Sequence, residues 1–68
     1  MKKTIIIEGM SCNHCVMAVK NALLEIEGVS KVDVELNNNR AIVEGENLVN
    51  NLLEEVVEEA GYNVIEIN

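Results

Sequence analysis

The chain has 68 residues, of which 49% are hydrophobic and 25% are charged. This length suits a single small domain over residues 1–68 and excludes an enzyme with a separate cofactor domain. Twelve acidic and five basic residues give a net charge of −7, and one Tyr is the sole aromatic residue, which excludes the basic, base-stacking surfaces that bind nucleic acids. No apolar run approaches the roughly 18 residues of a membrane span or forms a signal peptide, so we expect a soluble cytoplasmic protein.

The first part of the chain predicts a strand and then a helix. Thr4–Glu8 is a compact β-branched run, typical of a strand, that ends at Gly9. From Cys15 onward, apolar residues recur at the spacing of one helix face, and Gly28 is expected to end this helix. The apolar residues of this face are Val19, Ala22, Leu23 and Ile26.

A β-hairpin is predicted next. Apolar and charged residues alternate over Val32–Leu36, which is typical of a half-buried strand. Asn37–Asn39 supply residues that tolerate a left-handed turn, and Arg40–Glu44 is expected to pair back antiparallel.

A second helix and a last strand complete the chain. Asn47 is the expected N-cap of this helix, Gly61 ends it, and Tyr62–Ile67 is another β-rich run. The order βαββαβ predicts an α+β fold of the ferredoxin-like type, in which two helices cover one face of a four-stranded antiparallel sheet. The helix carries an acidic ridge that is typical of a solubilising face, and any partner of this ridge is expected to be basic. The ridge consists of Glu54, Glu55, Glu58 and Glu59.

Both cysteines lie between the first strand and the first helix. Cys12 belongs to the connecting loop and should be exposed, whereas Cys15 begins the buried stripe of the helix. A disulfide across this spacing would close only a tiny loop, so a structural bridge is a poor interpretation. A helix N-terminus favours the thiolate, which is both a nucleophile and a metal ligand, so redox and metal functions both stay open.

The number of available ligands indicates which metal ion the site could bind. Structural zinc takes four protein ligands, and the chain offers two cysteines and one histidine. Cu(I) is soft, prefers thiolate and accepts fewer ligands, so an exposed pair of cysteines suits it. Such an open site also lets a partner's thiol attack the metal, as metal transfer requires.

These residues resemble the heavy-metal-associated domain family, in particular the small bacterial copper chaperones that share this domain with copper-transporting P-type ATPases. Residues 9–15, GMSCNHC, match the family's GMxCxxC loop, and Gly28-Val29 and Gly61-Tyr62 match its later glycine motifs. The resemblance implies the βαββαβ fold, no enzymatic activity, and Cys12 and Cys15 as the Cu(I) ligands. It also implies transfer of copper through shared thiolates to the metal-binding domain of a P-type ATPase or to a copper-responsive regulator.

Three further residues are candidate modulators of the site. Met10 offers a thioether, although the equivalent family residue usually packs beneath the loop. His14 could ligate a metal or tune the thiols, and a solvated histidine is the commoner outcome. Tyr62 resembles the tyrosine that bacterial chaperones carry near the metal loop, and its alternative role is that of a core aromatic residue.

Several alternatives stay open at this stage. The chain could be a metal-binding domain excised from an ATPase, although Met1 and an end at Asn68, one residue past the last strand, favour a complete chaperone. The same thiols could carry Hg(II), Cd(II) or Zn(II), and a dithiol oxidoreductase is the remaining rival. We expect a monomer without metal and copper-bridged dimers with it.

Overall fold

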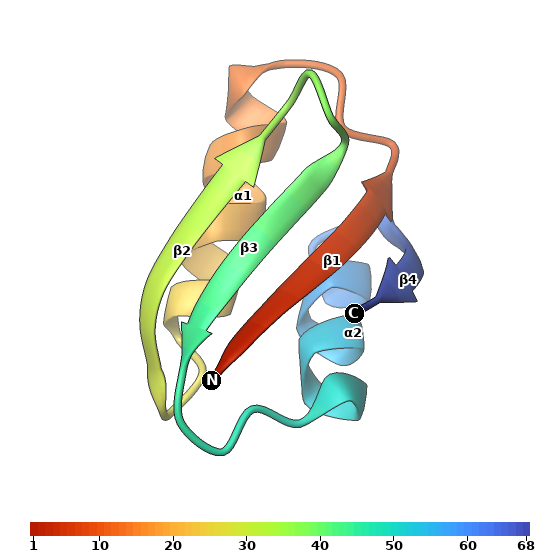
Figure 1. The fold of residues 1–68 in the computed structure, drawn as a ribbon. Coiled ribbons are helices and arrows are strands. Elements are labelled where there is room, and N and C mark those ends of the chain that lie inside the picture. Colours follow the sequence, from red (N-terminus) through yellow and green to blue (C-terminus); the bar gives the residue numbers. More distant parts are fainter.

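A computed structural model describes all residues from Met1 to Asn68 and contains the six predicted elements in the predicted order. The sheet is antiparallel throughout, with strand order β2-β3-β1-β4. Both helices lie behind the sheet in Figure 1, so they cover one of its faces and the α+β, ferredoxin-like prediction is confirmed. Neither helix is long and apolar enough to cross a bilayer. The elements are β1 (Lys2–Glu8), α1 (Asn13–Leu24), β2 (Val29–Glu35), β3 (Arg40–Gly45), α2 (Asn50–Glu59) and β4 (Asn63–Ile67).

The core fills the space between the sheet and the two helices. Alternate residues of β1 and β3 face inward because successive side chains of a strand point to opposite faces. Each helix adds one buried stripe, and no polar side chain is buried with them. Burial of each large aliphatic side chain stabilises the fold by about 1.5–3 kcal/mol. The fully buried side chains of largest volume are Ile5, Ile7, Val19, Leu23, Val43, Leu53 and Val57.

The edge strand β4 contains an irregularity. Ile6 pairs with Glu66 while Ile7 pairs with Val64, so Ile65 is left outside the register and is 58% exposed. The shift keeps Val64 on the side of the core and increases the local twist. A short, irregular edge strand is a poor template for pairing with another chain.

The helix ends differ from the sequence-based expectation. α1 ends at Leu24 with Glu25 as its C-cap, four residues before Gly28, which nevertheless adopts the expected left-handed conformation at φ +95°. Ile26 lies in the intervening turn and is still buried. The apolar periodicity therefore continued beyond the helix, because a turn can bury the next apolar residue as well as a helix can.

The prediction that Asn47 caps α2 is wrong. Val49 is the N-cap, and no side chain caps the helix. Asn47 instead adopts a left-handed conformation with φ 57°, which Asn tolerates better than most residues. This turn buries Leu48 in the core before the helix begins, so the packing of Leu48 determines where α2 starts.

Gly45 is needed because two backbones approach closely at the end of β3. A β-carbon at this position would collide with the carbonyl oxygen of Gly28 and lie 2.8 Å from the α-carbon of Val29. A β-carbon at Gly61 would meet no atom within 4 Å, although the φ of Gly61 is +102°. Gly45 is therefore required because no space exists for a side chain, whereas Gly61 is required only for its positive φ.

We expect Gly45→Ala to lower the free energy of unfolding by about 3 kcal/mol, because strands β2 and β3 must move apart to accept the methyl group. Gly61→Ala is the control and should cost about 1–2 kcal/mol, the penalty for a left-handed alanine. Urea denaturation of both variants checks the difference. Equal decreases in the free energy of unfolding would contradict this prediction, because they would show that the two strands accept the methyl group without strain.

Candidate metal centre

Residues 9–12 connect β1 to α1 at the upper end of the molecule in Figure 1. Gly9 turns the chain with a φ of +105°, which disfavours other residues. Met10 follows and is only 8% exposed, as part of the hydrophobic core. The prediction that Met10 packs beneath the loop is therefore confirmed, and this side chain anchors the loop to the domain.

Cys12 is the N-cap of α1 and has an extended backbone. Its carbonyl oxygen accepts hydrogen bonds from the backbone N–H groups of Cys15, at 3.0 Å, and Val16, at 3.2 Å. These bonds form the first turn of the helix and bring residues i and i+3 to the same side. The geometry of one helical turn thus determines how far apart the two thiols lie.

The two sulfur atoms are 3.8 Å apart, and both cysteines are free thiols. A disulfide would need a separation of about 2.05 Å. Metal–thiolate bonds of about 2.3 Å allow one ion to reach both sulfurs at the observed separation. As predicted, Cys12 is exposed, whereas Cys15 is half-buried and packs against the core.

Polar groups around Cys15 increase the acidity of its thiol. They lower the pKa of Cys15 from its ordinary value of 9.0 to about 6, the largest effect coming from the backbone of Ser11 and the next from the Tyr62 side chain. Burial opposes this shift. The same interaction raises the pKa of the Tyr62 hydroxyl, because its proton is shared with Cys15. Cys15 is therefore a thiolate at neutral pH.

Tyr62 reaches the loop from the segment just before β4. Its hydroxyl contributes to the lowered pKa of Cys15, and its ring lies against Gly9, where a β-carbon would be 3.6 Å from Cδ1. The expectation that this tyrosine lies near the loop is confirmed. Its half-buried ring also packs against the core, so this side chain contacts both the loop and the core.

Ser11 is a residue that the sequence analysis missed. Its hydroxyl oxygen lies 3.8 Å from the Cys15 sulfur, and its backbone provides the largest effect on the pKa of that thiol. The available signal was the spacing, since Ser11 precedes Cys15 by four residues. A side chain placed just before a helix is well positioned to contact its first turn.

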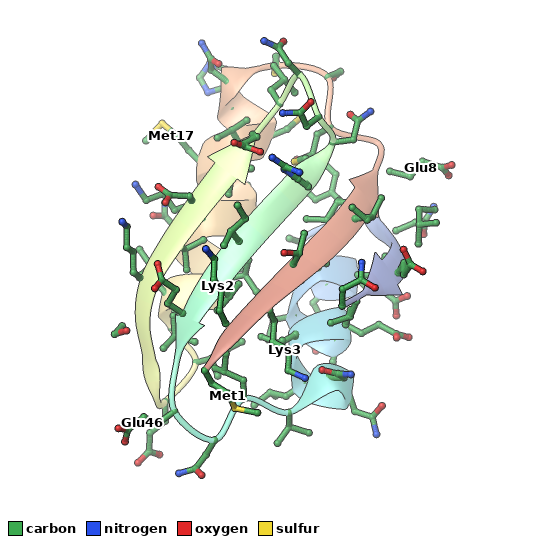
Figure 2. All side chains as sticks on the ribbon, in the orientation of Figure 1. Met1, Lys2, Lys3, Glu8, Met17 and Glu46 are labelled. Atoms are coloured by element: carbon green, nitrogen blue, oxygen red, sulfur yellow. The ribbon has the colours of Figure 1, made fainter.

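The other candidate ligands do not join the cysteines. His14 is exposed and is the second residue of α1, not part of the loop as expected. Glu8 is the carboxylate nearest to the cysteines in the sequence, and Figure 2 shows its side chain directed away from the body of the molecule. No group of three or more Cys, His, Asp or Glu side chains in the structure is placed to hold a metal ion. The site therefore offers two thiols from this chain.

The sequence profile of the heavy-metal-associated domain matches residues 4–63. The chain belongs to the heavy-metal-associated domain family. It is 41% identical over 66 residues to a copper chaperone CopZ of Staphylococcus haemolyticus, covering 94% of this chain and 97% of that protein. The family is one of metal carriers and not of enzymes, as predicted.

Solved structures agree with this assignment to the heavy-metal-associated family. A CopZ metallochaperone superposes with a TM-score of 0.92 at 34% identity, over 96% of this chain and all of that one. A copper-binding domain from HMA7, a P-type ATPase, superposes with a TM-score of 0.91 at 34% identity, over all of this chain and 95% of that one. Free chaperones and ATPase domains thus share this fold.

The acidity of Cys15 can be measured by alkylation with iodoacetamide in the Cys12→Ser variant, where Cys15 is the only thiol. The alkylation rate should increase with pH, and the midpoint of the increase should lie at about 6. Below this pH the thiol is protonated and the reactive thiolate is lost. Replacing Tyr62 by Phe in the same variant should move the midpoint upward, since a hydrogen bond to the thiolate is lost. The urea-unfolded protein is the control, and a folded midpoint equal to the unfolded one would contradict the assignment.

Proposed function

We propose that this protein is a copper metallochaperone that binds one Cu(I) ion between the thiolates of Cys12 and Cys15. The observation that carries the proposal is the pair of reduced sulfurs 3.8 Å apart on an exposed loop. Thiolate is the ligand that soft Cu(I) prefers. Because the pKa of Cys15 is about 6, this sulfur is available as a thiolate ligand at neutral pH.

Copper is favoured over zinc by the donor set. Structural zinc sites take four protein ligands, whereas this structure groups no third candidate side chain with the cysteine pair. Similar proteins point to the same metal, since the relative from Staphylococcus haemolyticus is named a copper chaperone and the ATPase domain is described as copper-binding. The same thiols remain able to hold other thiophilic ions, so selectivity is part of the test.

The difference between the two cysteines suits transfer by ligand exchange. Cys12 is exposed and Cys15 is held by hydrogen bonds and core contacts, so an incoming thiolate reaches the metal on the side of Cys12. Its bond to Cu(I) forms as the bond to Cys12 breaks, and the Cys12 thiolate takes up the proton released by the partner's thiol. Copper remains Cu(I) throughout, and a second exchange frees Cys15.

The partner in this scheme is a domain with its own exposed pair of thiols. The metal-binding domain of a copper-transporting P-type ATPase fits this description, as the similarity to the HMA7 domain supports, and a copper-responsive regulator is the second candidate. Two copies of this chain that share one ion would form a copper-bridged dimer by the same chemistry.

An anaerobic titration of Cu(I) against a coloured chelator tests the binding step. The wild-type protein should hold one equivalent, and Cys12→Ser and Cys15→Ser should each weaken binding by at least about 100-fold, because one thiolate alone is a poor site. His14→Ala is the matched control, since His14 neighbours Cys15 but joins no ligand group, and its affinity should change less than about threefold.

Two results would overturn the proposal. One is retention of Cu(I) by the variant that lacks both thiols. The other is tighter binding of Zn(II) than of Cu(I), which would assign the site to a different metal.

A further inference from the structure

An open groove of about 470 Å³ lies between α1 and α2. Two rows of apolar residues line the groove, one from each helix and the turn that follows it. Within each row the residues are four positions apart in the sequence, so they lie on the same side. Small alanines occur in both rows and leave room between the helices. The first row is Ala22 and Ile26, and the second is Leu52, Val56 and Ala60.

The apolar stripe of α2 is wider than the core requires. Leu53 and Val57 face the core and are 1% and 0% exposed. Their neighbours Leu52 and Val56 line the groove instead, and Leu52 is 41% exposed. Val49, the N-cap of α2, is also 55% exposed, although it is not among the residues that line the groove. Exposed apolar side chains that gather in a groove are typical of an interaction surface.

The polar residues of the groove all carry negative charge. Glu25, Glu27 and Glu59 belong to its lining, and no basic residue does. The helices and their flanking turns, residues 9–28 and 46–61, hold seven of the twelve carboxylates but only one of the five basic residues, Lys20. The other basic residues lie on strands, and Lys3, which shares the inward side of β1 with Ile5, is not among the lining residues.

We propose that this groove docks an amphipathic segment of a partner protein whose aliphatic side chains enter the groove and whose Lys or Arg side chains pair with the three carboxylates. Charge complementarity selects this occupant. A second copy of the chain would bring the same carboxylates face to face, and an anionic membrane or a nucleic acid would be repelled. The acidic ridge on α2 extends the attractive field beyond the groove.

The groove is separate from the cysteine pair. Ala22 lies seven residues after Cys15, about 10 Å along the helix axis. In Figure 1, α2 begins at the end of the molecule opposite the loop of residues 9–12. No cysteine belongs to the lining, although Ala60, at the other end of the groove, precedes Tyr62 by only two residues. A partner that uses both surfaces gains affinity through effective concentration.

The test uses the metal-free protein, so its outcome does not depend on the proposed copper function. The probe is a 12-residue helical peptide of Leu and Lys with blocked ends, titrated into ¹⁵N-labelled protein and followed by NMR. We expect saturable shifts of the backbone amides of Ala22, Ile26, Leu52 and Val56 and none at Cys12 or Cys15. A peptide of the same length with Glu in place of Lys should produce no shifts.

Two matched pairs of variants distinguish docking from general attraction. Glu59→Lys should weaken binding about fivefold, whereas Glu54→Lys, the same charge change on the same helix but outside the lining, should weaken it less than about twofold. Leu52→Ala should weaken binding, and Ile65→Ala, at an exposed residue of β4, should not. Equal effects of the two charge reversals, shifts centred on residues 9–15, or no saturable binding would overturn the proposal.

Discussion

The first turn of α1 is the constraint on which the rest of the site depends. It holds the sulfurs of Cys12 and Cys15 3.8 Å apart, and it lies at the edge of a core that keeps it in place. Met10 anchors the chain before the turn, and Val19 and Leu23 anchor the helix after it. The two thiols are therefore close together before any ligand arrives, which lowers the entropic cost of binding an ion between them.

A carrier must hold its cargo and also release it, and the two cysteines divide these tasks. Cys15 packs against the core, and the polar groups of Ser11 and Tyr62 lower the pKa of its thiol. Cys12 is exposed and lies outside the core cluster. Because the structure adds no third ligand of its own, the proposed site stays open to a partner's thiolate. The proposed docking groove between α1 and α2 would bind the partner protein through residues other than the cysteines.

The element order, the antiparallel sheet and the core faces could be predicted because hydrophobic periodicity reports them directly. The start of α2 could not, since the burial of Leu48 outweighed the capping preference of Asn47. The cysteine pair was evident from its spacing, whereas the contact of Tyr62 with Cys15 joins residues 47 positions apart and was expected only by resemblance. The groove depends on the distance between the two packed helices, and local sequence patterns do not predict that distance.

X-ray absorption spectroscopy at the copper edge of the protein loaded with one equivalent of Cu(I) identifies the atoms that bind the ion. We predict a first shell made only of sulfur in the wild-type protein and in His14→Ala, and a shell with fewer sulfurs in Cys12→Ser. A nitrogen contribution that disappears in His14→Ala would contradict the two-thiolate site. So would a sulfur shell that is unchanged when Cys12 is replaced.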